Sequence, residues 1–146
     1  MSVRRIDHYA IRTADLEPTR RFYTEVIGLT VGPRPPFEFP GLWLYCGDAG
    51  APGNAVVHVI GIDAAGKEHL RAPTADGSSS AGVTGPVDHI AFGATGLAEM
   101  RAKLESLGVP YRLRTVPQTG LHQIFLEDPS GIVLELNYAA HEVEAR

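Results

Sequence analysis

The stretch Val87-Asp88-His89-Ile90-Ala91-Phe92 decides the fold of this chain. Successive side chains of a strand point to opposite faces, so His89 shares one face with a small alanine. The bulky apolar residues Ile90 and Phe92 lie on the other face, where they can pack on a helix. The same pattern occurs near the start of the chain, in Ile6-Asp7-His8-Tyr9-Ala10-Ile11. Its presence at two places predicts a duplicated unit.

Further matches extend the duplication over most of the chain. His8 and His89 lie 81 positions apart, and the glycines Gly28 and Gly108, each between two apolar residues, lie 80 apart. The other matched pairs are Tyr45 with Phe125, Asp48 with Asp128, and His58 with Glu135. Self-similarity at a nearly constant spacing is a strong sign of a repeated architecture.

Each half has the pattern strand–helix–strand–strand–strand. In a first module, residues 3–60, we expect strands at 3–12, 29–31, 42–46 and 55–60 and a helix from a cap at Asp15 to Gly28. In a second module, residues 87–137, we expect strands at 87–92, 111–116, 121–127 and 132–137 and a helix from Thr95 to Gly108.

Segment 61–86, rich in Gly, Ser and Pro, is expected to be a long connecting loop. Residues from 141 onward are expected to fray. One such sheet with one helix cannot bury both faces, so the modules are expected to form a single α+β domain, residues 1–146.

Composition excludes several classes of protein. The chain is 44% hydrophobic and 21% charged, which argues against disorder, and its formal net charge of −4 argues against nucleic acid or an anionic membrane as partner. No apolar run approaches the roughly 20 residues that span a bilayer. The first residues lead directly into a strand rather than a signal peptide, which favours the cytoplasm. Cys46 cannot form an internal disulfide and is expected to be a small buried residue.

The two histidine motifs, together with the segment from Phe125 to Glu135 (Phe-Leu-Glu-Asp-Pro-Ser-Gly-Ile-Val-Leu-Glu), resemble the vicinal oxygen chelate superfamily. This superfamily includes glyoxalase I, methylmalonyl-CoA epimerase, extradiol dioxygenases, and fosfomycin- and bleomycin-resistance proteins. The resemblance covers about residues 3–137. It implies paired βαβββ modules whose mixed sheets curl into a cup, with the helices on the outer face and a divalent metal ion inside.

The resemblance implies four metal ligands: His8, His58, His89 and Glu135. Taken singly, each histidine is more often an exposed or hydrogen-bonded side chain than a ligand. Together, on strands whose opposite faces are apolar, the four polar groups would be costly to bury without a common partner. Imidazoles with a carboxylate suit Fe, Mn, Ni, Co or Zn. The resemblance leaves two roles open for His58, a fourth ligand or an acid/base.

Strand alternation also predicts which other side chains face the cup. These are Arg12, Trp43, Tyr45, Gln123, Phe125 and Asn137. Aromatic walls with a few polar groups describe a small-molecule pocket, although core packing explains Trp43 and Phe125 equally well. The remaining histidines, His69, His122 and His141, are expected to lie outside the site.

Three functions follow from the resemblance. The first is lyase or isomerase chemistry, in which the metal holds two adjacent substrate oxygens and stabilises an enediolate while Glu135 or a displaced ligand shuttles the proton. The second is an extradiol-type dioxygenase with an Fe(II) site made by His8, His89 and Glu135 and with His58 as acid/base. The third is a non-catalytic drug-binding protein of the bleomycin-resistance type.

Two of these functions are less favoured. Phe125 stands ten residues before Glu135, where the dioxygenases are expected to have a tyrosine. Drug-binding members commonly lack the ligand set that this chain retains. Because family members often form homodimers and open sheet edges need covering, we expect a homodimer.

Overall fold

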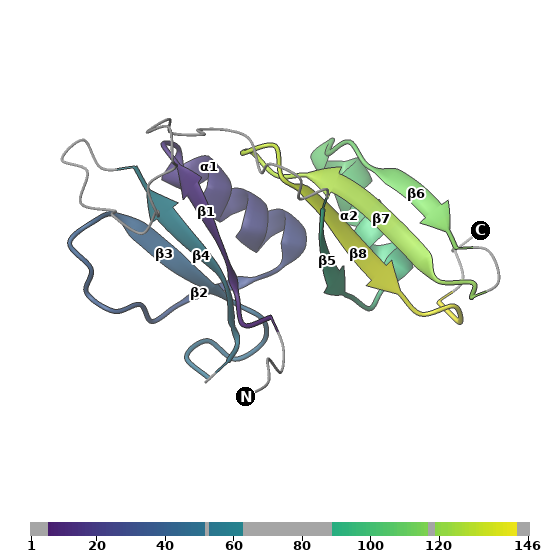
Figure 1. Ribbon diagram of the computed structural model, residues 1–146. Helices are drawn as coiled ribbons and strands as arrows, with labels where there is room; N and C mark the ends of the chain where they lie inside the picture. Colours follow the sequence, from purple (N-terminus) through teal and green to yellow (C-terminus); the bar gives the residue numbers. More distant parts are fainter. Residues whose placement is uncertain (1–5, 52, 63–88, 117–118, 143–146) are drawn as a thin grey trace, which may run out of the picture. The chain divides into compact units, whose positions relative to one another are not determined.

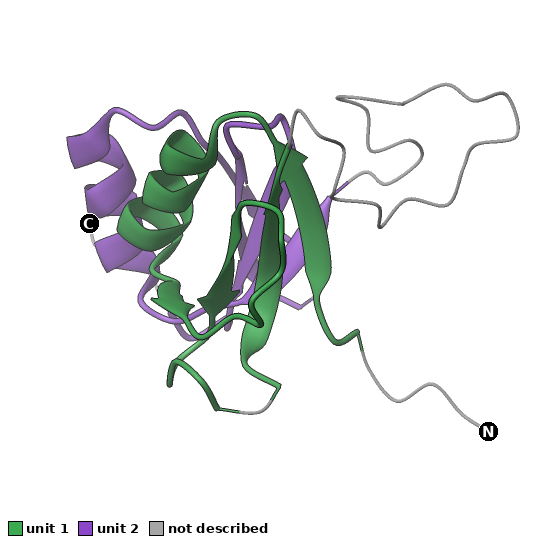
Figure 2. Cartoon of the chain, turned by 90° about the vertical axis from the view of Figure 1, so that its left-hand side faces the viewer, with its two compact units in different colours: residues 1–81 green, residues 82–146 purple. Residues whose placement is uncertain are grey.

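The computed structural model describes residues 6–51, 53–62, 89–116 and 119–142 (Figure 1). The chain divides into two compact units, residues 1–81 and 82–146 (Figure 2). Each unit holds one module of the predicted strand–helix–strand–strand–strand order. Parts of the predicted organisation lie outside the described residues, namely residues 3–5, residues 63–86 of the connecting segment, and Val87 and Asp88.

The first unit contains one four-stranded sheet. Its elements are β1 (Tyr9–Thr13), α1 (Leu16–Arg21), η1 (Phe22–Ile27, a π-helix), β2 (Thr30–Gly32), β3 (Gly41–Tyr45) and β4 (Ala55–Gly61). The strands lie in the order β1-β4-β3-β2, and only β1 and β4 are parallel. The first and last strands of the module are therefore neighbours.

The second unit repeats this arrangement. Its elements are β5 (Ile90–Gly93), α2 (Leu97–Leu107), β6 (Arg112–Thr115), β7 (His122–Glu127) and β8 (Val133–Tyr138). The order is β5-β8-β7-β6, again with the first and last strands parallel. The predicted α+β class and the two βαβββ modules are thus confirmed. No helix in the described ranges is long and apolar enough to cross a membrane.

The cores follow from the alternation of the strands. One face of each sheet is apolar and buried, and in Figure 1 a helix covers a face of the sheet in its own unit. In the first unit Leu44, Val57 and Tyr23 are fully buried, and in the second Ile124 and Leu104 are. Burying one such side chain contributes roughly 1.5–3 kcal/mol. By alternation, His58 and Glu135 lie on the opposite face of their sheets from their buried apolar neighbours.

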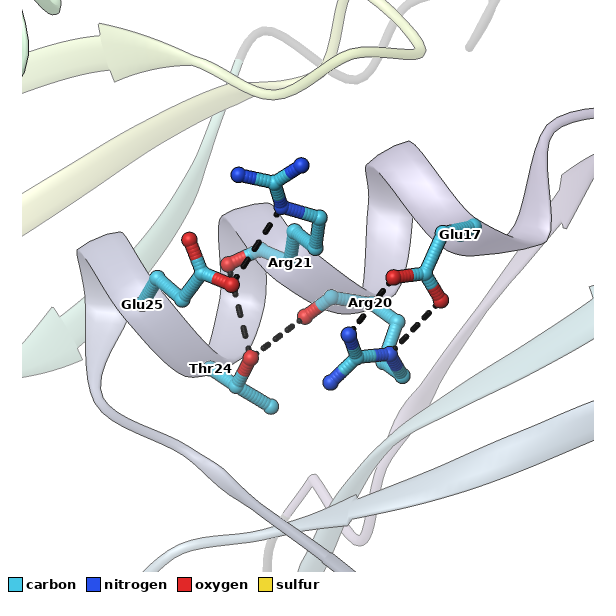
Figure 3. Close-up of polar contacts among 5 residues, drawn as sticks. All are labelled: Glu17, Arg20, Arg21, Thr24 and Glu25. Atoms are coloured by element: carbon cyan, nitrogen blue, oxygen red, sulfur yellow. Dashed lines mark hydrogen bonds and ion pairs between the residues drawn. The ribbon is translucent and has the colours of Figure 1, made fainter.

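Polar contacts cover the exposed side of the first helical segment (Figure 3). Arg20 donates to both carboxylate oxygens of Glu17, at 2.8 and 2.6 Å, and Arg21 pairs with Glu25 at 3.3 Å. The Thr24 hydroxyl donates to the carbonyl oxygen of Arg20 at 2.9 Å. These groups are solvated, so they stabilise the fold little.

The predicted helix ends and the position of the first cap at Asp15 are confirmed, whereas the predicted cap of α2 is corrected. Gly28 and Gly108 end the helices with φ of 91° and 65°, a left-handed conformation that glycine adopts without steric cost. Asp15 occupies the cap position of α1, but its side chain makes no capping hydrogen bond. Thr95 does not cap α2. Instead, Glu142 Oε2 accepts hydrogen bonds from the backbone N–H groups of Gly96 (2.6 Å) and Leu97 (3.0 Å).

Two further expectations are wrong. The prediction that the tail frays fails at Glu142, which those two hydrogen bonds tie to the start of α2, while residues 143–146 of that tail lie outside the described residues. A carboxylate is favoured there because the N-terminus of a helix carries partial positive charge. Cys46 is exposed rather than buried, because β3 ends one residue before it, at Tyr45.

Tyr138 is expected to make the stability of the protein fall in alkali. Its ring is fully buried, and burial together with the charge of Glu142 raises the pKa of Tyr138 to about 12. Above pH 10 the unfolded chain loses this proton while the folded chain keeps it. Between pH 10 and 12 the free energy of unfolding should therefore fall by on the order of 1–2 kcal/mol through this group.

Comparing urea unfolding of the wild type and Tyr138→Phe at pH 7, 9, 10.5 and 11.5 checks this. The variant should lose less stability than the wild type above pH 10. At pH 7 it should be at least as stable, because the Tyr138 hydroxyl has no hydrogen-bond partner among the described residues. An identical pH dependence of the two proteins would contradict the prediction.

Candidate functional site

The two motif histidines stand at equivalent places in the two units. His8 and His89 each immediately precede the first strand of their module rather than lying inside it, and their side chains are 38% and 37% exposed. The last strand of each module carries the next candidate: His58 on β4 and Glu135 on β8. Parallel pairing brings each of these strands beside the first strand of its unit.

The strand register confirms that His58 and Glu135 are equivalent. Ala10, two residues after His8, lies opposite His58. Ala91, two residues after His89, lies opposite Glu135. The small alanine leaves room beside each polar group. The duplication therefore pairs individual candidate ligands, with His58 of the first unit corresponding to Glu135 of the second.

The first pair is a stack of aromatic rings. The imidazoles of His8 and His58 have centroids 3.7 Å apart, and the indole of Trp43 stacks on His58 at 4.0 Å with an angle of 5° between the planes. Burial and the proximity of His8 lower the pKa of His58 to about 4. His58 is therefore neutral at pH 7. The Asp7 carboxylate lies 2.9 Å from His8 Nδ1.

The second pair sits in a network of amides. Glu135 is only 8% exposed, and its Oε1 accepts hydrogen bonds from Gln123 Nε2 at 2.9 Å and Asn137 Nδ2 at 2.7 Å. Gln123 Nε2 also donates to Asn137 Oδ1 at 3.1 Å. The other carboxylate oxygen, Oε2, lies 3.2 Å from His89 Nε2. One oxygen is thus held by the protein while the second faces the imidazole.

Phe125 completes this cluster, and its place corrects one predicted match. Its ring meets His89 edge-on, with centroids 6.1 Å apart. Phe125 lies opposite Glu135 in the register, which is the place that Trp43 holds opposite His58. The counterpart of Phe125 is therefore Trp43 and not Tyr45. Trp43 and Phe125 lie 82 positions apart, so the spacing of 80 that matches the glycines does not reveal this pair.

A pocket of about 90 Å³ opens beside the first pair. It is lined by His8, Ala10, Arg34, Phe37, Phe39, Trp43, His58, Val59 and Ile60. Arg34, Phe37 and Phe39 were missed by the sequence analysis, because the proline-rich segment between β2 and β3 has no alternation to indicate where a side chain points. Only the presence of aromatic residues beside an arginine could have drawn attention to it.

The remaining predicted residues of the first unit lie outside this lining. Tyr45 is buried and donates a hydrogen bond to the carbonyl oxygen of Pro33 at 2.6 Å. Its ring covers Gly32, where an added Cβ would come within 2.6 Å of two ring carbons. Arg12 lies opposite Ile60, toward the far end of β1 from His8.

In the second unit, Arg112 lies with its guanidinium carbon 4.9 Å from the centre of the Phe125 ring. Both residues line an open cavity of about 480 Å³. Arg112 was not among the predicted residues. Its position on an exposed strand gave no sign of a contact with an aromatic ring.

The other histidines lie apart from these pairs. His122 Nδ1 is 3.2 Å from the Thr115 hydroxyl, and His141 is exposed. His69 lies outside the described residues. The described residues contain no ready-made group of three or more His, Cys, Asp or Glu side chains that could hold a metal ion, and each unit contributes one pair of the predicted four.

Comparisons with known proteins agree with this architecture. Residues 5–136 match the model of the Glyoxalase/Bleomycin resistance protein/Dioxygenase superfamily. A search of curated protein sequences finds no match. Among solved structures, a protein described as belonging to the glyoxalase family from Bacillus anthracis is 22% identical, with a TM-score of 0.65 over 95% of this chain and 98% of that one.

Two other solved structures share the fold. The lactoylglutathione lyase from Agrobacterium tumefaciens is 21% identical over 91% of this chain and 92% of that one, with a TM-score of 0.55. The fosfomycin resistance protein FosX from Listeria monocytogenes is 16% identical over 97% and 98%, with a TM-score of 0.60. With the family match covering almost the whole chain and the two βαβββ modules in place, this protein belongs to the glyoxalase/bleomycin resistance protein/dioxygenase superfamily.

Proposed function

We propose that the protein is a divalent-metal-dependent enzyme that acts on a small molecule with two adjacent oxygen atoms, by lyase or isomerase chemistry. The observation that carries the proposal is the equivalence of His58 and Glu135, each on the last strand of its module and each close to the histidine that precedes the first strand. The metal ligands in this proposal are His8, His58, His89 and Glu135.

The chemistry of these donors fits such an ion. Three imidazoles and one carboxylate suit Fe, Mn, Ni, Co or Zn. Glu135 is buried, with one oxygen saturated by amide donors and the other directed at His89. We assign His58 to the ligand set because it holds the position that Glu135 holds in the other unit. When bound, the ion supplies positive charge that polarises the adjacent substrate oxygens.

Glu135 is the proposed proton carrier. Its Oε2 accepts a proton from the carbon next to the substrate oxygens and returns it to the product. The amides of Gln123 and Asn137 hold the carboxylate in one orientation while this happens. Trp43, which stacks on His58, and Phe125, whose ring meets His89, are proposed to keep water away from these two histidines.

Lyase or isomerase chemistry is favoured over ring cleavage by dioxygen. Phe125 has no hydroxyl group to act as acid/base, although its ring touches the His89 side of the cluster. A structural relative of this chain is a lactoylglutathione lyase, which is consistent with lyase chemistry in this fold. The fosfomycin resistance relative is consistent with a small-molecule substrate.

The test combines metal analysis with a chemical readout. Protein purified without oxygen is analysed for metal and then loaded with Fe(II), Mn, Ni, Co or Zn. Small 2-hydroxycarbonyl compounds are incubated with it in D₂O, and proton NMR follows exchange at the carbon next to the oxygens. We expect about one ion per chain and exchange that depends on the ion.

Two results would overturn the proposal. Protein that carries no metal and takes none up would fit a drug-binding module instead. Oxygen uptake with a panel of catechols by the Fe(II) form, with no exchange in D₂O, would fit a dioxygenase.

A further inference from the structure

The pocket beside His8 and His58 has an unusual balance of charge. Its walls are aromatic and aliphatic, and the only permanently charged side chain among the described residues of its lining is Arg34. No carboxylate is part of that described lining. A small cavity with one cation and apolar walls favours an anionic group over a neutral or positive one.

Arg34 is held in place by its own loop. Its Nη2 donates to the carbonyl oxygen of Phe39 at 2.8 Å, and its guanidinium carbon lies 5.0 Å from the ring centres of both Phe37 and Phe39. Such contacts between a cation and aromatic faces fix the guanidinium. Among the described residues only Phe39 accepts a hydrogen bond from Arg34, so most of its five N–H donors stay available.

The dimensions of the pocket limit what it can hold. A cavity of about 150 Å³ holds a benzene molecule, whereas this pocket measures about 90 Å³. Its walls include two pairs of nearly parallel rings, Phe37 with Phe39 at 10° and Trp43 with His58 at 5°. Flat walls suit a planar group, and the fork of a guanidinium matches the two oxygens of a carboxylate. A planar carboxylate fits this space better than a bulkier tetrahedral oxyanion.

We propose that Arg34 binds a carboxylate of the substrate, which makes the substrate a small carboxylic acid. The carboxylate lies against Arg34, and the rest of the molecule extends toward His8 and His58, which line the same pocket. This inference rests on the proposed function for the reaction at the other end of the substrate. Arg34 is then the residue that selects an acid over its neutral analogues.

Trp43 allows a direct test, because it is the only tryptophan of the chain and lines this pocket. Its fluorescence is titrated with glycolate, lactate and pyruvate, and with the amide of each acid, in the presence of EDTA. We expect at least one acid to bind saturably and about tenfold more tightly than its amide. Arg34→Gln should weaken the acid to the level of its amide, and Arg34→Lys should retain part of the preference.

Arg21→Gln is the matched control. It removes the same charge from an exposed ion pair on the first helical segment (Figure 3), so the acid should bind it as it binds the wild type. If Arg34 only packs its loop, Arg34→Gln will weaken acid and amide equally, and the inference is wrong. The inference is also wrong if none of the three acids binds the wild type more tightly than its amide does. Because EDTA removes metal ions, this titration does not depend on whether the protein binds a metal. A failure of the inference about Arg34 can therefore be told apart from a failure of the metal analysis.

Discussion

Glu135→Ala is expected to lose nearly all of its bound metal and to lower the rate of the metal-dependent reaction by at least about 100-fold. The substitution removes the only carboxylate of the proposed ligand set, and it removes the proton carrier. It also leaves the amides of Gln123 and Asn137 without the oxygen that they share. Metal per chain by elemental analysis and exchange in D₂O measure the two losses separately.

Glu135→Gln separates ligand loss from damage to the sheet. Its side-chain oxygen can still accept the two amide hydrogen bonds, so its unfolding transition should stay close to that of the wild type while metal and activity are lost. His89→Ala should lose the metal as well. His141→Ala is the control, because His141 is exposed and lies outside the proposed site. Near-stoichiometric metal in His89→Ala would show that the ligand assignment is wrong.

His58→Ala decides between the two roles that the sequence leaves open for this residue. Loss of metal would support its place in the ligand set. Retention of most of the metal with loss of exchange would assign it to acid/base chemistry instead, and our assignment of His58 as a ligand would then be abandoned.

Asp128→Ala is expected to lower the free energy of unfolding by about 2–4 kcal/mol. Asp128 is only 5% exposed, and its Oδ1 accepts hydrogen bonds from the backbone N–H groups of Ser130 and Ile132, both at 2.8 Å. The backbone turns sharply at Gly131, whose φ is 78°. Without the carboxylate, two backbone donors lose their acceptor at the turn that joins β7 to β8.

The first module supplies the control for this prediction. Asp48 is the residue matched to Asp128 by the repeat, but it is exposed, and among the described residues of its turn only its backbone carbonyl accepts hydrogen bonds. Asp48→Ala should change stability by less than about 0.5 kcal/mol. Asp128→Asn keeps an oxygen acceptor and should fall between the two. Urea unfolding followed by circular dichroism measures all three, and equal effects at positions 48 and 128 would contradict our account of the turn.

The two turns also show what a repeat in the sequence does and does not predict. The match of Asp48 with Asp128 is correct as a position along the chain, yet only one of the two carboxylates is buried and bonded to its turn. Likewise, the pairing of Tyr45 with Phe125 fails, because Trp43 is the residue that lies opposite His58 as Phe125 lies opposite Glu135. Spacing counts residues, whereas the register depends on which hydrogen bonds the strands form.

The sequence by itself determined the order of strands and helices, the duplication, the helix ends at Gly28 and Gly108, and the equivalence of His58 with Glu135. The strands and the helix ends are local properties, because they follow from the alternation of side chains along a strand and from the backbone freedom of glycine. The duplication and the equivalence follow from residues matched at a nearly constant spacing.

Only the tertiary structure decided which groups meet. It tied Glu142 to the start of α2, set the Gln123 and Asn137 amides on Glu135, and brought Arg34 beside Phe37 and Phe39. Asn137 and Glu135 share β8, but the other contacts join separate strands, distant parts of the chain, or residues of a loop without a repeating pattern. Their physical cause is the packing and pairing of whole elements, which no periodicity within a single segment encodes.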